Sequence, residues 1–274
     1  MVLCMNRGFI KFIFMLVGFT LMIVPYLLLA PQVHKEQIEK ERLEEEARKK
    51  FIEERRTYLL GKFDQSVHPE FVKVSADLNM GQGAMYLRKE TYNAFLKMRE
   101  AALKEGITLN VASATRNFDY QKTLWEKKWN GITLVEGKSL PESIPNSLER
   151  FRKILEYSAA PGTSRHHWGT DIDINGADVS YFNTERGIKE YAWLTQNAPL
   201  FGFCQTYNER GLNRPNGYNE EKWHWSYLPV SRLLTIEYKN LIAEKDITGF
   251  AGDSFVKNLD LVNNYILALN PNCL

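Results

Sequence analysis

The chain has 274 residues, of which 44% are hydrophobic and 25% are charged. This composition is typical of a folded globular protein and excludes a disordered, collagen-like or cysteine-stapled chain. The 35 lysines and arginines nearly balance the 33 aspartates and glutamates, and the net charge of +2 excludes the broad basic face of a nucleic-acid-binding protein.

Residues 12–30, FIFMLVGFTLMIVPYLLLA, form an uncharged run after a short N-terminal tail, residues 1–11. A helix of this length spans about 30 Å, the thickness of the bilayer hydrocarbon, and membrane helices tolerate a proline such as Pro25. The Leu-Leu-Ala sequence before Pro31 is a poor signal-peptidase site. We therefore predict an uncleaved transmembrane signal-anchor at 12–30; a cleaved signal peptide and a buried core helix are the alternatives.

Residues 31–60 predict a charged helical stalk. From 34 to 56 the chain has eight basic and eight acidic residues and no glycine or proline. Pairs four residues apart, such as Glu45 and Lys49, each stabilise a helix by a few tenths of a kcal/mol. A thin apolar stripe also permits a short coiled-coil contact. Gly61 is expected to end the helix.

Residues 61–274 predict one domain. Apolar residues at helical spacing and alternating apolar residues mark the expected elements. The expected helices cover 86–105, 117–131, about 147–157, 185–196 and 230–244, and the expected strands begin at 107 and cover 170–174. Helices mixed with short strands, without a regular βαβ rhythm, favour the α+β class over a doubly wound sheet.

The three cysteines are distributed on both sides of the predicted anchor. Cys4 precedes it, whereas Cys204 and Cys273 follow it. A disulfide between the latter two suits an exported domain, but the sequence alone does not place them within bridging distance.

Two short segments contain residues that suit a catalytic metal ion. A catalytic zinc ion takes three imidazole or carboxylate ligands and leaves a fourth position open for water. His166, Asp173 and His224 supply such a set, and Glu221 lies close to His224 as a general base. Taken singly, each is more often structural, since a lone histidine usually makes internal hydrogen bonds.

The expected strand 170–174 carries two carboxylates on one face. Asp171 and Asp173 share that face, while Ile172 and Ile174 take the other. Burying carboxylates is costly without partners, so this face indicates a bound cation or a polar cleft.

Four ordered motifs resemble the zinc D-alanyl-D-alanine carboxypeptidases of the VanY type over about residues 85–230. The motifs are Ser-Ala-Thr-Arg-Asn at 113–117 with Gln121, Ala-Pro-Gly-Thr-Ser at 160–164, Ser-Arg-His-His-Trp-Gly-Thr-Asp-Ile-Asp at 164–173, and Glu-Lys-Trp-His at 221–224. These bacterial cell-wall peptidases are related in fold to D-Ala-D-Ala dipeptidases and the Hedgehog signalling domain. The resemblance implies a small antiparallel sheet flanked by helices.

Seven residues match the family's functional positions: His166, Asp173 and His224 as Zn2+ ligands, Glu221 as general base and acid, and Arg116, Ser164 and Gln121 as substrate-binding residues. The resemblance implies hydrolysis of the C-terminal D-alanine of peptidoglycan stem peptides. Glu221 would take a proton from the zinc-bound water and return it to the leaving amine. The planar guanidinium of Arg116 suits the substrate's terminal carboxylate.

Asp171 departs from the family's pattern, which commonly has alanine at this position. Its carboxylate either supports a ligand histidine or points past the metal to solvent. Because the family lacks it, we expect Asp171→Ala to keep zinc and to keep activity within about tenfold. His167 has no assigned role.

The motifs do not determine which bond is cut. An L,D-carboxypeptidase, a D-Ala-D-Ala dipeptidase and a peptidoglycan endopeptidase are the alternatives, and a non-catalytic zinc-bearing binding domain is disfavoured by the presence of Glu221. We expect stem peptides and the membrane as partners, no nucleic acid, and an undetermined oligomeric state.

The expected location is the bacterial cell envelope, with the domain outside the cytoplasmic membrane. Two basic residues precede the predicted anchor and six follow it within about 20 positions. That count favours the opposite orientation, although interleaved acids weaken it.

Overall fold

The computed structural model describes residues 7–81 and 83–274, with side chains at residue 32 and from residue 34 onward. The chain divides into two units, Met1–Glu53 and Glu54–Leu274. The helices are α1 (Arg7–Leu59), α2 (Lys89–Lys104), α3 (Phe118–Trp129), α4 (Leu140–Ser143), α5 (Ser147–Ile154), α6 (Glu185–Asn197), α7 (Leu228–Leu241) and α8 (Val256–Leu259). The strands are β1 (Phe71–Lys73), β2 (Tyr86–Arg88), β3 (Val111–Ser113), β4 (Asp171–Ile174), β5 (Phe203–Gln205) and β6 (His224–Tyr227).

The first unit consists of most of α1. Its charged side chains pair along the helix, with Lys49 at 2.8 Å from Glu45 and Arg42 bonded to both Glu39 and Glu46. These pairs are exposed and contribute little each. Across the described residues, no helix is both long enough and apolar enough to cross a membrane. The side chains of the predicted anchor at 12–30 lie outside the described residues.

The last turn of α1 is part of the second unit. Tyr58 and Leu59 are buried there. The Tyr58 hydroxyl donates to the Trp168 carbonyl at 2.7 Å, and the Trp168 indole donates to the Leu59 carbonyl at 3.1 Å. Gly61 follows with a left-handed φ of +73°, and a Cβ there would lie 2.5 Å from the His167 ring. Glycine is therefore required where the helix ends.

A four-stranded antiparallel sheet positions the site. Its strand order is β3-β4-β6-β5, which confirms the α+β class with a small antiparallel sheet. In the pairing of β4 with β6, Asp173 lies opposite His224 and Asp171 lies opposite Ser226. Because side chains alternate along a strand, these four polar residues share one face.

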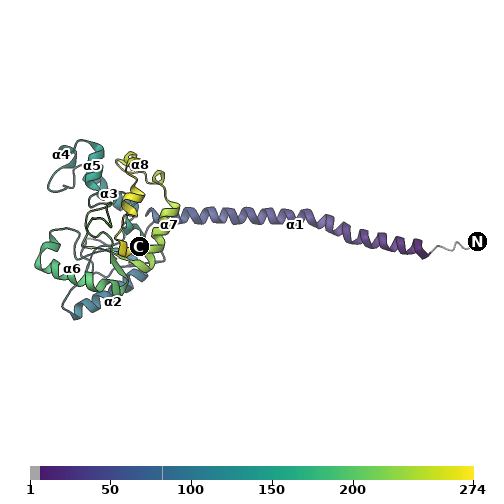
Figure 1. The fold of residues 1–274 in the computed structure, drawn as a ribbon, viewed down its shortest axis with the longest axis horizontal. Coiled ribbons are helices and arrows are strands. Elements are labelled where there is room, and N and C mark those ends of the chain that lie inside the picture. Colours follow the sequence, from purple (N-terminus) through teal and green to yellow (C-terminus); the bar gives the residue numbers. More distant parts are fainter. Residues whose placement is uncertain (1–6, 82) are drawn as a thin grey trace, which may run out of the picture. The chain divides into compact units, whose positions relative to one another are not determined.

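The other face of this sheet is apolar. Ile172, Ile174 and Trp225 pack there in one cluster with Phe95 of α2 and Trp193 of α6. The two helices lie on the same side of the unit in Figure 1. A second apolar cluster is formed by the end of α1 together with residues of α3, α5 and α7. The polar face thus lies within the unit and not at its surface.

The sequence-based boundaries differ from the structure mainly at the strands. The helix expected from residue 86 begins only at Lys89, because Tyr86–Arg88 pairs with β1 as an extended strand. The helix expected at 117–131 is α3, and the Asn117 side chain caps it by accepting from the Tyr120 amide. The strands β1, β5 and β6 were not predicted.

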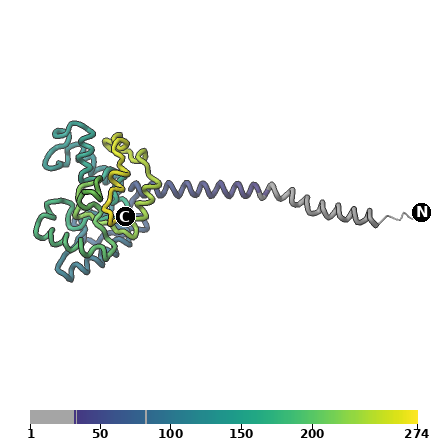
Figure 2. The backbone as a smooth tube through the Cα atoms, viewed as in Figure 1, coloured from purple at the N-terminus to yellow at the C-terminus, as the bar shows by residue number. Residues whose placement is uncertain are grey.

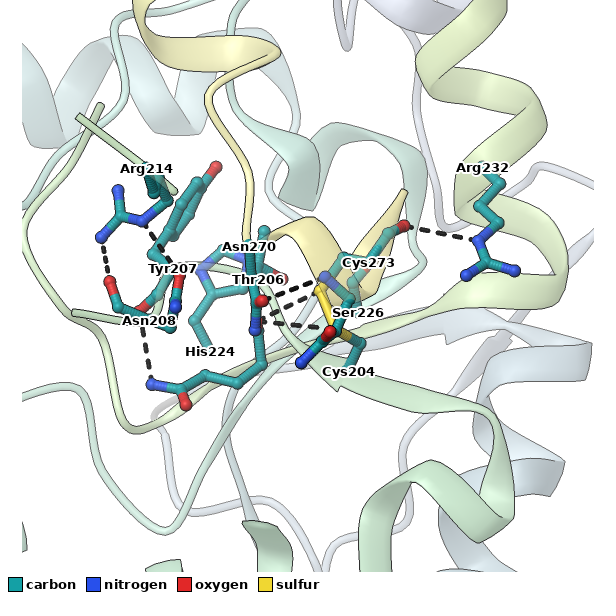
Figure 3. Close-up of a disulfide and its surroundings, with 12 residues drawn as sticks. Cys204, Thr206, Tyr207, Asn208, Arg214, His224, Ser226, Arg232, Asn270 and Cys273 are labelled. Carbon is teal, nitrogen blue, oxygen red and sulfur yellow. Dashed lines mark hydrogen bonds between the residues drawn. A yellow bond between two sulfur atoms is a disulfide. The ribbon is translucent and has the colours of Figure 1, made fainter. Parts of the chain in front are cut away.

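The chain end is attached to the edge strand β5. Cys204 on β5 forms a disulfide with Cys273, with a Cα–Cα distance of 5.6 Å, and the side-chain amide of Asn270 donates to the Gln205 carbonyl at 2.9 Å (Figure 3). In Figure 2 the yellow C-terminal segment runs back beside green parts of the tube. These bonds cover a sheet edge that would otherwise be open.

Candidate active site

Three potential metal ligands converge on the polar face of the sheet. His166 comes from a short 3-10 helix (Arg165–Trp168), Asp173 from β4 and His224 from β6, and their ligand atoms all lie within 4.8 Å of one another. His166 Nε2 is 3.3 Å and His224 Nδ1 is 3.7 Å from Asp173 Oδ1. Tetrahedral zinc with bonds of about 2.0–2.2 Å separates its ligand atoms by similar distances.

Two of these ligand atoms have no hydrogen-bond partner. His166 Nε2 and Asp173 Oδ1 are buried and unsatisfied among the described residues. His166 Nδ1 donates to the Ala114 carbonyl at 2.9 Å, which leaves the Nε2 lone pair directed at the cluster. Each unsatisfied buried group costs about 1–3 kcal/mol. A bound cation would remove that cost, so the two imidazoles and one carboxylate fit zinc.

The protonation states of His166 and Asp173 suit metal binding. Burial, followed by the positive charge of Arg116, lowers the pKa of His166. Burial opposes ionisation of Asp173, but the neighbouring histidines and Arg116 outweigh it and lower the pKa of that carboxyl to about 2. Neutral imidazole and ionised carboxylate are the forms that bind a metal ion.

His224 has a different partner at each ring nitrogen. Nε2 lies 3.0 Å from Asp171 Oδ1, and Nδ1 lies 2.9 Å from Glu221 Oε2. Burial alone would lower the pKa of His224, but these two carboxylates raise it. Burial also raises the pKa of Glu221 despite its contact with His224. A raised carboxyl pKa is characteristic of a catalytic general base.

Asp171 is fully buried and fully hydrogen-bonded. Its Oδ1 accepts from Arg165 Nε at 3.1 Å, and its Oδ2 accepts from Thr170 at 2.6 Å and Ser226 at 3.1 Å. Burial opposes ionisation, yet Arg165 and His224 outweigh it and lower the pKa of this carboxyl. Of the two alternatives for Asp171, exposure to solvent is excluded and contact with a candidate ligand histidine is observed.

His167 lies beside the cluster and has two partners. Its Nε2 accepts from the Gly162 amide at 3.0 Å, and its Nδ1 donates to the Arg116 carbonyl at 2.5 Å. Burial lowers its pKa to about 3, so the ring is neutral. This histidine therefore joins the loop before the first ligand to the segment that carries Arg116.

All seven residues singled out from the sequence line one cavity of about 160 Å³: Arg116, Gln121, Ser164, His166, Asp173, Glu221 and His224. The structure adds Lys128 and the aromatic residues Tyr157, Tyr207 and Trp223 to the lining. Lys128 follows Gln121 by seven residues on α3, and that spacing places both on one helix face. The spacing from Gln121 is therefore the feature of the sequence that could have identified Lys128 as a cavity residue.

Comparison with protein families identifies the family of this chain. The family model of VanY, D-alanyl-D-alanine carboxypeptidase, matches residues 84–230, just over half of the chain. The chain belongs to this family, which confirms the resemblance found in the four motifs.

Two curated relatives are similar to part of the chain. "Putative carboxypeptidase YodJ" of Bacillus subtilis is 28% identical over 164 residues, covering 58% of this chain and 53% of that protein. "D-alanyl-D-alanine carboxypeptidase" of Enterococcus faecalis is 26% identical over 151 residues, covering 53% and 50%. The chain therefore spans about half the length of these curated relatives.

Two solved structures are similar to the chain at lower identity. VanYB in complex with D-alanine-D-alanine is 21% identical, with a TM-score of 0.47, and the match covers 67% of this chain and 90% of that one. The LdcB LD-carboxypeptidase is 24% identical, with a TM-score of 0.46, and the match covers 68% and 79%.

Proposed function

We propose that the chain is a zinc-dependent peptidase that removes the C-terminal D-alanine of peptidoglycan stem peptides, with His166, Asp173 and His224 as the zinc ligands. The observation that carries the proposal is the pair of buried, unpartnered ligand atoms on His166 and Asp173 beside Glu221. Membership of a D-alanyl-D-alanine carboxypeptidase family supports the substrate class. Zinc bound at this position polarises a carbonyl group and acidifies water.

The chain's own residues supply proton transfer and substrate binding. Glu221, with its raised pKa, takes a proton from the attacking water at a carboxylate oxygen and returns it to the leaving nitrogen. Arg116 projects into the same cavity and binds the substrate's terminal carboxylate, with Ser164 and Gln121 beside it. The Tyr207 ring packs edge-on at 4.9 Å from the His224 ring.

The deciding experiment uses the full chain loaded with zinc. It is incubated with muropeptides that end in D-Ala-D-Ala or in a single D-Ala, and the products are identified by mass. Release of one D-alanine from the first substrate is expected. Release of a dipeptide, cleavage of a cross-link, or action only on the single D-Ala would assign one of the alternative bonds instead.

A matched pair of variants tests the role of Glu221. Glu221→Gln should lower kcat by about 10²–10⁴-fold, because it removes the general base. Glu220→Gln is the control, since Glu220 contacts the Tyr191 hydroxyl outside the cavity. Equal activity of Glu221→Gln and the parent would reject this mechanism.

We also propose that the domain works outside the cytoplasm in the bacterial envelope, attached through residues 12–30. The disulfide between Cys204 and Cys273 supports an oxidising compartment. Protease added to intact spheroplasts should digest the domain while cytoplasmic proteins survive, and carbonate washing should leave the chain in the membrane fraction. A protected or carbonate-released chain would contradict the proposal.

A further inference from the structure

The cavity contains two cations without an acidic partner. Arg116 follows β3 and Lys128 lies on α3, and both line the cavity that contains Glu221. Within the described part of the chain, no carboxylate lies at ion-pair distance from either side chain. The Nε of Arg116 is buried with no hydrogen-bond partner, and the Lys128 ammonium donates to the neutral Ser158 hydroxyl.

Two other partly buried cations of the domain have acidic partners. Arg88 lies 2.8 Å from Glu70, and Lys153 lies 2.7 Å from Glu136. Lys128 differs, because burial and then the positive charge of Arg116 lower its pKa. Two neighbouring cations that are partly withdrawn from water disfavour each other, and a bound anion would relieve the repulsion.

Lys128 lies where the cavity joins a second groove. That groove has a volume of about 400 Å³ and shares with the cavity the residues Lys128, Tyr157, Ser158, Ala177 and Trp223. Arg116 lines only the inner cavity. A peptide whose terminal carboxylate is bound by Arg116, and which continues into the groove, therefore passes Lys128.

We propose that Lys128 is a second carboxylate-binding residue, so that the preferred substrate is a peptide with two carboxylates. One is the C-terminal carboxylate at Arg116, and the other is carried by a side chain near the groove. This inference rests on the proposed function and specifies its substrate class.

The test compares two peptides that end in D-Ala-D-Ala and differ in one group. The residue before D-Ala-D-Ala is diaminopimelate in one peptide and lysine in the other, so that only the first has a side-chain carboxylate. The parent chain should have a kcat/KM about tenfold higher for the diaminopimelate peptide, because a charge-assisted hydrogen bond to an ammonium is lost with lysine.

Lys128→Met should remove this preference. It should lower kcat/KM for the diaminopimelate peptide by about tenfold and leave the lysine peptide within about twofold. Lys127→Met is the matched control, because Lys127 is exposed on the same helix and does not line the cavity. Equal losses on both peptides, or no loss on either, would overturn the proposal.

A binding measurement separates this inference from the proposed function. The dissociation constants of both peptides are measured by calorimetry with zinc-loaded Glu221→Gln and with the double variant that adds Lys128→Met. A tenfold difference that disappears in the double variant supports Lys128 even if the parent hydrolyses neither peptide. If the two peptides had equal dissociation constants in each of the two protein variants, the inference would be contradicted.

Discussion

Buried carboxylates lie near both ring nitrogens of His224, but they differ in their hydrogen bonding. On the Nε2 side, Asp171 and Arg165 are nearly inaccessible, and Thr235 and Ser226 accept the remaining guanidinium hydrogen bonds. On the Nδ1 side, Asp173 is equally buried, but its Oδ1 is unsatisfied. Burial alone therefore does not distinguish a supporting carboxylate from a candidate ligand. The presence or absence of hydrogen-bond partners does.

The largest effect of a substitution is expected at Asp173, whose Oδ1 has no hydrogen-bond partner. Asp173→Ala should reduce bound zinc from about one ion per chain to near zero and lower peptide hydrolysis by about 10³-fold or more, because it removes a ligand. The metal-free variant should unfold within about 2–3 kcal/mol of the metal-free parent, since Asp173 Oδ1 has no hydrogen-bond partner and the ionised carboxylate is favoured only by the neighbouring histidines and Arg116. Metal analysis, peptide hydrolysis and denaturant unfolding measure these quantities.

The control for this experiment is Asp178→Ala. Asp178 is an exposed carboxylate in the adjoining groove, and its variant should keep stoichiometric zinc. Zinc retained by Asp173→Ala would show that another residue supplies the third ligand.

At Asp171, whose carboxylate is fully hydrogen-bonded, substitution by alanine should mainly lower the stability of the fold. Removing this carboxylate leaves Arg165 buried without an acidic partner, which should lower the free energy of unfolding by about 3–5 kcal/mol. Loss of the bond to His224 Nε2 should weaken zinc binding by about 10–100-fold. Both effects are larger than the sequence predicted. Because the family lacks this carboxylate, the sequence led us to expect that Asp171→Ala keeps zinc and keeps activity within about tenfold.

Adding Arg165→Met to this variant separates the two effects. The double variant should recover most of the stability, because no unpaired buried charge remains. It should still bind zinc weakly, since His224 still lacks its partner. If Asp171→Ala matched the parent in both thermal unfolding and zinc titration, the support assigned to Asp171 would be wrong.

The disulfide belongs to the supporting side, because it joins β5, the neighbour of β6 in the sheet, to the C-terminal segment. Replacing Cys204 and Cys273 by alanine should cost about 2–4 kcal/mol of unfolding free energy, since the bond closes a loop with a sequence separation of 69. Zinc affinity of the folded variant should be unchanged. Urea unfolding and a chelator competition would show this, and weakened zinc binding below the unfolding transition would place the disulfide in the site.

Two adjacent histidines also differ in their hydrogen bonding, and the smallest effect is expected there. His166 has an unsatisfied Nε2, whereas both nitrogens of His167 are bonded. The pKa of His167 is about 3 in the folded chain, below its ordinary 6.5, so the unfolded chain takes up this proton first as the pH falls. Stability from this group is therefore complete above about pH 6.5 and is lost between pH 6.5 and 3, at up to about 1.4 kcal/mol per pH unit.

His167→Gln removes this titration. Thermal unfolding of the metal-free variant should depend less on pH than that of the parent between pH 6.5 and 3. Parallel curves for the two proteins would mean that His167 is not held neutral.

The motifs were sufficient to find seven residues of the cavity but not their hydrogen-bond partners. His166, Asp173 and His224 were identified from residue type and spacing, and the sheet explains why spacing was informative. Asp173 and His224 are cross-strand neighbours on β4 and β6. The strand β6 itself was missed, although its four residues alternate polar and aromatic side chains much as those of β4 alternate aspartate and isoleucine.

The contacts of Asp171 depend on tertiary structure and could not be predicted. The position of Asp171 and Asp173 on one strand face indicated only a bound cation or a polar cleft. Arg165 lies in a 3-10 turn six residues earlier, and Ser226 and Thr235 come from β6 and α7. No local pattern predicts that these elements meet.

The burial of Tyr58 and Leu59 determines where the domain can be separated from the preceding helix. A cut at Gly61 would remove the hydroxyl that caps the Trp168 carbonyl and the carbonyl that receives the Trp168 indole. A cut upstream of Glu54 would leave both in place. A protease that sheds this domain in active form must therefore cleave within the charged part of α1, and cleavage at the visible end of the helix would release an unstable fragment.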